Sequence, residues 1–312
     1  MNNINIIKKL CGKINKFKIY KNATMYEGNN NKWILKKNTN NISDLYNYLL
    51  SRGFNYLPEI YFINNDIYIY KYVENTHTPN EQRASDLIKL DALLHNKTVY
   101  YKDISIDELK ELYEKIDINI IDTYNYYNNL LNNIESKIYM SPSEYMLARN
   151  SSMIFSCINF CKTNLDEWYE MMKKYKKERL VILHNNLDIN HIIRNNENIF
   201  ISWNKSKRDI PIYDFLKFYK NNYNKFDFNE LYNEYIKKFP LNNEERKLLF
   251  ILLFLPEQIV FNSNELLNTK KVSELCNYLV ITDNLFMKNE TKNTKKQYDE
   301  INEEKKNMKS SA

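Results

Sequence analysis

The stretch Arg179–Asp214 constrains the fold of this chain more than any other, because it places a polar loop between apolar segments. The apolar run Val181–Leu183 predicts a short buried strand, and the polar loop His184–Asn190 follows it. Ile192–Ile193 and Ile199–Trp203 predict two further strands with a turn between them. Strands on either side hold the side chains of such a loop in fixed positions, so we expect the functional residues there.

Three groups of residues in this stretch have the spacing of a known family. They are His184-Asn185-Asn186 with His191, then Ile201-Ser202-Trp203-Asn204, and finally Asp214-Phe215-Leu216. The chain thereby resembles the aminoglycoside phosphotransferase and choline kinase branch of the protein-kinase-like superfamily, to which the spore-coat-associated kinase-like proteins of spore-forming bacteria also belong. That family carries H-G-D-x-x-x-x-N on the loop, I-D-W-E/D on the next strand and D-L-A at a helix start. The resemblance implies a two-lobed α+β protein-kinase-like fold, with a small antiparallel β lobe and a larger helical lobe.

The residues that carry the chemistry in that family are replaced here. Asn186 stands where the family has the aspartate that takes the proton of the acceptor hydroxyl. An amide cannot act as a general base, and losing such a base typically costs about 10²–10⁴ in rate. His191 replaces the asparagine that helps to hold magnesium, and Ser202 replaces the main metal carboxylate. Magnesium prefers oxygen ligands, so we expect a catalytically impaired protein, a pseudokinase.

Other residues of the frame are expected to be structural. His184 opens the loop, and the family's aspartate that matches Asp214 caps a helix and ties back to the loop. His95 ends an apolar helix that resembles the family's L-x-x-L-H segment, and it is expected to form structural hydrogen bonds. Such roles do not depend on catalysis and can outlast it.

An active ATP-dependent small-molecule kinase with a rearranged site is the alternative interpretation. Asp188 would then replace the general base, and Asp209 or Asp214 would hold the metal. ATP and magnesium are expected as cofactors only under this alternative. A third interpretation is a helical interaction protein without a ligand site.

The sequence predicts that residues 13–75 form the small β-rich lobe. The pattern predicts strands at 17–20, 23–26, 33–37, 59–63 and 67–73, with a helix over 42–52 that Gly53 ends. The resemblance makes Lys36 the lysine that would pair with nucleotide phosphates, with Lys37 in its place if the register slips by one residue. Tyr72 lies in the expected hinge, where an adenine would meet backbone groups. The helix offers only Asp44 in place of the glutamate that anchors such a lysine in kinases.

Residues 76–287 predict a mainly helical lobe that contains the catalytic-type loop 184–204. Ser105–Glu108 and Ser141–Glu144 have the capping-box pattern of helix starts, and Asn164 with Glu167 suggests another. Further helices are expected from Asp214 and at 230–238, 243–255 and 270–286. The segment 288–312 has mixed charge and almost no apolar residues, which predicts a disordered or frayed tail.

The amino-acid composition limits the kinds of partner that this protein is expected to bind. The 45 basic and 39 acidic residues give a mild net charge of +6, spread along the chain. Nucleic-acid binding needs a clustered basic face, so a nucleic-acid partner is not expected. Abundant Asn, Lys, Ile and Tyr are typical of an AT-rich genome. Cys157 and Cys161 lie four residues apart on an expected helix, as core-facing thiols do.

The longest apolar run, Leu248–Leu255, is far shorter than the roughly 20 residues that span a bilayer. The N-terminus is polar and lacks the pattern of a signal peptide. These features predict a cytoplasmic protein without a membrane span, and only the resemblance suggests spore association. We expect a kinase-like binding or scaffold protein whose partner is an unknown protein or small molecule.

Overall fold

The computed structural model describes residues 3–20, 23–29, 31–38, 42–195 and 197–310, and the side chains of the described residues from 6 to 290. The strands are β1 (Lys16–Tyr20), β2 (Ala23–Glu27), β3 (Lys32–Lys37), β4 (Ile60–Ile63), β5 (Ile67–Lys71), β6 (Tyr100–Asp103), β7 (Lys177–Leu183), β8 (Ile192–Arg194), β9 (Asn198–Phe200) and β10 (Lys207–Asp209). The helices are α1 (Asn3–Cys11), α2 (Ile42–Ser51), α3 (Asn80–Thr98), α4 (Ile106–Glu135), α5 (Pro142–Arg149), α6 (Ser151–Tyr175), α7 (Ile212–Asn222), α8 (Phe228–Lys238), α9 (Asn243–Phe254) and α10 (Glu265–Ser310). Short 3₁₀ turns are η1 (Ile189–His191) and η2 (Trp203–Lys205).

The chain divides into two compact units. The first contains residues 1–101, 179–218 and 233–240, and the second contains residues 102–178, 219–232 and 241–312. The boundaries of these units differ from the lobe boundary predicted near residue 75. That lobe boundary stays a prediction.

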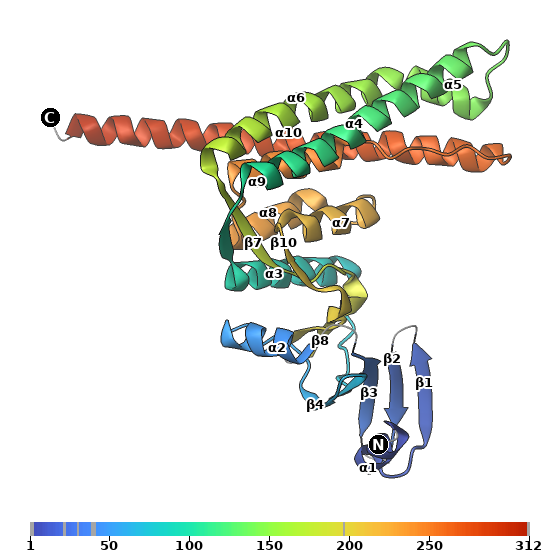
Figure 1. Ribbon diagram of the computed structural model, residues 1–312, viewed down its shortest axis with the longest axis vertical. Coiled ribbons are helices and arrows are strands. Elements are labelled where there is room, and N and C mark those ends of the chain that lie inside the picture. The colour runs from blue at the N-terminus through green and yellow to red at the C-terminus, as the bar shows by residue number, and fades with distance from the viewer. Residues whose placement is uncertain (1–2, 21–22, 30, 39–41, 196, 311–312) are drawn as a thin grey trace. The chain divides into compact units, whose positions relative to one another are not determined.

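A five-stranded antiparallel sheet, in the order β1-β2-β3-β5-β4, dominates the N-terminal part of the first unit (Figure 1). It confirms the five strands predicted before residue 75. One face packs on α1, where Ile7 and Cys11 meet Trp33 and Ile69. Gly28 lies so close to α1 that an added Cβ would be 2.3 Å from the carbonyl oxygen of Cys11, so only glycine fits there.

The end of β7 and the segment after it form two small strand pairings in the first unit. Val181, Ile182 and Leu183 pair with β10, and β8 pairs with β9 as a hairpin. The predicted strand over Ile199–Trp203 is shorter than expected, because Ser202 takes a left-handed conformation with φ 73° and Trp203 begins η2. Helix α2 ends as predicted, since Gly53 has φ 73° and the amide of Phe54 bonds to the carbonyl of Leu49 at 2.9 Å.

Long helices form most of the second unit. Helix α6 packs on α4 and α9, and α10 packs on α5 (Figure 1). Capping boxes at Ser105 and Ser141 start α4 and α5 as predicted. The helix start predicted at Asn164 is wrong, because α6 continues through this residue. The side-chain amide of Asn164 donates a hydrogen bond of 2.9 Å to the carbonyl of Phe160. Cys157 and Cys161 are buried on α6, as predicted.

Helix α10 differs from the expected C-terminal tail. Its backbone stays helical to Ser310, through most of the segment 288–312 for which the sequence predicted disorder or fraying. That segment contains neither glycine nor proline and is rich in Lys and Glu, which favour helix. Within the described part of the chain, every helix is too short or too polar to span a bilayer.

Candidate functional site

Lys36 is turned into the protein by the register of β3. The burial of β3 makes Lys36 6% exposed and Lys37 exposed, and the pairing with β5 sets Lys36 opposite Tyr68. Burial lowers the pKa of the Lys36 ammonium to about 8. Its Nζ donates a hydrogen bond of 3.1 Å to Oγ of Ser202. Among the described residues, no carboxylate lies within 4.0 Å of this ammonium, so its partner is a neutral hydroxyl.

The loop that begins at His184 is held by one buried carboxylate. Asp214, near the start of α7, accepts the backbone N–H of His184 through Oδ2 and that of Asn185 through Oδ1, both at 2.7 Å. The Nε2 of His184 lies 2.8 Å from the carbonyl of Ile201, so this nitrogen carries the proton. Burial lowers the pKa of His184 to about 4, and the ring is neutral at pH 7.

Asn186 and His191 face each other across the loop. The Nδ1 of His191 lies 2.7 Å from the backbone carbonyl of Asn186, so Nδ1 is the protonated nitrogen. Burial lowers the pKa of His191, which favours the neutral imidazole. The two residues thus offer an amide and a neutral imidazole, and neither is a carboxylate.

The acidic residues considered as replacements have other partners. Asp188 is exposed and caps η1, with its Oδ1 2.7 Å from the amide of Asn190. The carboxylate of Asp209 pairs with Lys207 and accepts the amide of Ile210. Asp214 is buried against the loop amides. The residues at this site therefore do not fit magnesium, because Asn186, His191 and Ser202 are neutral and these carboxylates are engaged elsewhere.

Asp214, which holds the loop, belongs to a buried cluster with Asp91 and His95. The Nε2 of His95 lies 3.5 Å from Asp91 and 3.4 Å from Asp214, and its Nδ1 lies 2.7 Å from the hydroxyl of Tyr235. Burial and then the nearby Asp214 carboxylate raise the pKa of Asp91, so it is the neutral acid. Burial also acts to raise the pKa of Asp214, but hydrogen bonding and charge from His95 lower it overall, so it is the anion.

The motif that ends at His95 predicts a structural role for this histidine and does not include Asp91. The signal was present, because Asp91 precedes His95 by one helical turn on the buried face of α3, where most side chains are apolar. An acid on the buried face of a helix needs a partner, and the residue four positions later supplies it.

Tyr72 follows β5 at the expected hinge. Its backbone N–H donates to the carbonyl of Lys32 at 2.9 Å, and the ammonium of Lys32 lies 5.7 Å from its ring centre. The backbone amide of Tyr72 is therefore used within the protein. Just beyond it, the amide of Thr76 bonds to the carbonyl of Arg194 at 2.7 Å.

The fold occurs among known structures, although no protein-family model and no curated protein matches the sequence. An aminoglycoside phosphotransferase from Alicyclobacillus acidocaldarius subsp. acidocaldarius DSM 446 matches with a TM-score of 0.60 and 8% identity, over 89% of this chain and 93% of that one. Choline kinase LicA from Streptococcus pneumoniae matches with a TM-score of 0.45 and 12% identity, over 88% and 98%. The first match confirms the predicted fold class, the α+β kinase-like fold of the aminoglycoside phosphotransferases.

Proposed function

We propose that this protein is a pseudokinase that works as a binding or scaffold protein. The observation that carries the proposal is the hydrogen bond from Lys36 to Ser202. By resemblance, an active member would have its main metal carboxylate at position 202. A hydroxyl there supplies neither the charge that magnesium needs nor the counter-charge that Lys36 lacks.

The other replacements support the same proposal. Asn186 cannot take a proton from an acceptor hydroxyl, and the protonated Nδ1 of His191 is bonded to the Asn186 carbonyl. The alternative, an active kinase with a rearranged site, would need Asp188, Asp209 or Asp214 to turn towards the metal. Each would first have to leave the contacts described above, and Asp214 would leave two loop amides without an acceptor.

The nucleotide roles of Lys36 and Tyr72 stay predictions. The Lys36 ammonium uses one of its three N–H donors on Ser202 and could meet a phosphate with the others, and Tyr72 could meet an adenine only through groups other than its amide. A cytoplasmic location and a role in spore assembly are implied by sequence and resemblance alone.

Thermal unfolding tests the proposal. The melting temperature is measured with and without ATP, each in magnesium, manganese or EDTA. Since a ligand at 100 times its dissociation constant adds about 2.7 kcal/mol of stability, binding is readily visible. We expect no magnesium-dependent shift with ATP. Such a shift in the unmodified protein, or transfer of phosphate from ATP, would favour the active alternative.

A restored variant makes the test sharper. Ser202→Asp combined with Asn186→Asp and His191→Asn returns the family's groups to the loop, and we expect it to gain a magnesium-dependent shift with ATP. Ser273→Asp, an added carboxylate at an exposed position of α10, is the matched control and should gain none. A folded triple variant that does not respond would show that these three positions do not explain the loss.

A further inference from the structure

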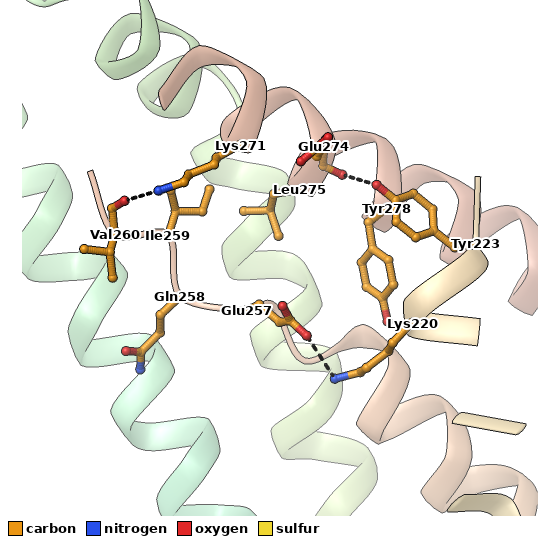
Figure 2. Close-up of a pocket in the computed structure, with 10 residues that line it drawn as sticks. All are labelled: Lys220, Tyr223, Glu257, Gln258, Ile259, Val260, Lys271, Glu274, Leu275 and Tyr278. Atoms are coloured by element: carbon orange, nitrogen blue, oxygen red, sulfur yellow. Dashed lines mark hydrogen bonds and ion pairs between the residues drawn. The ribbon is translucent and has the colours of Figure 1, made fainter. Parts of the chain in front are cut away.

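A cavity of about 450 Å³ lies in the second unit, and no role has been assigned to it above (Figure 2). It is lined by Lys220, Tyr223, Glu257, Gln258, Ile259, Val260, Lys271, Glu274, Leu275 and Tyr278. The walls are the C-terminal end of α7, the segment 257–260 and α10 (Figure 2). Pockets for small organic molecules typically measure about 300–1,000 Å³, so this cavity has the size of a ligand site.

Lys220 brings a partly exposed ammonium to the cavity. Its side chain is only 30% exposed, and its nearest ionic partner is the carboxylate of Glu257 at 3.9 Å. That distance is too long for a hydrogen bond, and Glu257 is itself 78% exposed. Among the described residues, no acceptor lies within hydrogen-bonding distance of the Lys220 ammonium. An anionic group in the cavity would give this ammonium hydrogen-bond acceptors and a counter-charge closer than that of Glu257.

Beside Lys220, two tyrosine rings form an aromatic wall. Tyr223 and Tyr278 pack edge to face, with ring centres 5.1 Å apart and an angle of 88°. Their hydroxyls donate to the backbone carbonyls of Glu274 at 3.2 Å and Leu253 at 2.8 Å, so the rings rather than the hydroxyls are left for a ligand. Leu275 adds a buried aliphatic surface. These groups suit the apolar body of a small molecule.

The segment 257–260 is held in place without a ligand. The hydroxyls of Tyr127 and Tyr126 on α4 donate to the carbonyls of Glu257 and Ile259, respectively. The ammonium of Lys271 donates to the carbonyl of Val260 at 2.7 Å. Because this wall is fixed in advance, a ligand would not have to order it on binding.

We propose that this cavity binds a small organic anion, with its carboxylate or phosphate group on Lys220 and its apolar body against Tyr223, Tyr278 and Leu275. Glu257 turns outward into solvent when the anion takes its place beside the ammonium. The site does not depend on whether the loop at His184–His191 is catalytic.

Calorimetric titration of the full chain tests this assignment with defined probes. Phenylacetate and phenyl phosphate are the anionic probes, and phenylacetamide is the neutral analogue of the first. We expect both anions to bind with saturation in the millimolar range or below, and the amide to bind at least about 10-fold more weakly, because it lacks the charge-assisted hydrogen bonds. The tighter of the two anions identifies the preferred head group.

Substitution of Lys220 completes the test. Lys220→Met should weaken the anions at least about 10-fold, whereas Lys220→Arg, which keeps the charge, should retain binding. Lys225→Met, at an exposed position outside the lining, is the matched control and should bind as the unmodified protein does. Circular dichroism checks that each variant is folded. Equal affinity for amide and acid, unchanged binding in folded Lys220→Met, or no saturation by either anion would overturn the proposal.

Discussion

Lys36 and Lys220 are both largely buried lysines whose pKa is lowered by burial, yet their surroundings differ. Lys36 is bonded to a hydroxyl of its own chain. Lys220 faces a cavity and has only a distant, exposed carboxylate beside it. This difference in partners is the reason that we propose a ligand site at Lys220 and none at Lys36.

The two regions also differ in how their backbone is held. A buried anion, Asp214, fixes the loop at His184, whereas neutral phenols fix the segment 257–260 beside Lys220. Charge-assisted hydrogen bonds in a buried place are stronger than neutral ones. Substitutions should therefore cost more at the loop than at the cavity.

The largest effect is expected from Asp214→Asn. An amide of the same shape turns an N–H group towards backbone donors and leaves His95 without its anion, so the free energy of unfolding should fall by about 3–5 kcal/mol. Urea unfolding followed by circular dichroism measures it. Asp209→Asn is the control and should cost about 0–1 kcal/mol, since its ion pair is near the surface. Equal losses would show that the Asp214 carboxylate does not hold the loop.

The next largest effect is expected from Lys36→Met, which should raise the free energy of unfolding. The folded state lowers the pKa of Lys36 from 10.5 to about 8, so between these values the unfolded chain binds more protons and stability rises with pH. At pH 7 the buried charge is a cost, and removing it should stabilise the protein by about 1–3 kcal/mol.

The same variant should lose the rise in stability between pH 8 and 10.5. Urea midpoints measured over this range, for Lys36→Met and the unmodified protein, check it. Lys37→Met, at the exposed neighbour, should leave the curve within about 0.5 kcal/mol of the original. Parallel curves for Lys36→Met and the unmodified protein would contradict an unpaired buried charge at Lys36.

The smallest effect is expected from Tyr127→Phe. The substitution leaves the carbonyl of Glu257 without its phenol donor and should cost about 1 kcal/mol. Amide hydrogen exchange at residues 257–260 should become faster, because the wall of the cavity is less firmly held. Tyr124→Phe, an exposed tyrosine of α4, is the matched control. Unchanged exchange in Tyr127→Phe would mean that the phenol does not fix this segment.

The local elements of this protein follow from short stretches of its sequence. Alternation of apolar residues set the five strands before residue 75, and the capping boxes at Ser105 and Ser141 set two helix starts. Gly53 set the end of α2, and the apolar spacing placed Cys157 and Cys161 inside. These features depend on backbone geometry and on the periodicity of side chains over a few residues. Residues close together in the sequence are therefore enough to predict them.

The partner of Lys36 and the lining of the cavity, in contrast, depend on how distant parts of the chain come together. The loop spacing indicated Asn186, His191 and Ser202, but the bond from Lys36 to Ser202 joins residues 166 positions apart. The cavity at Lys220 likewise needs α7, the segment 257–260 and α10 together. The direction of a side chain and its burial depend on residues distant in sequence, and no local pattern records them.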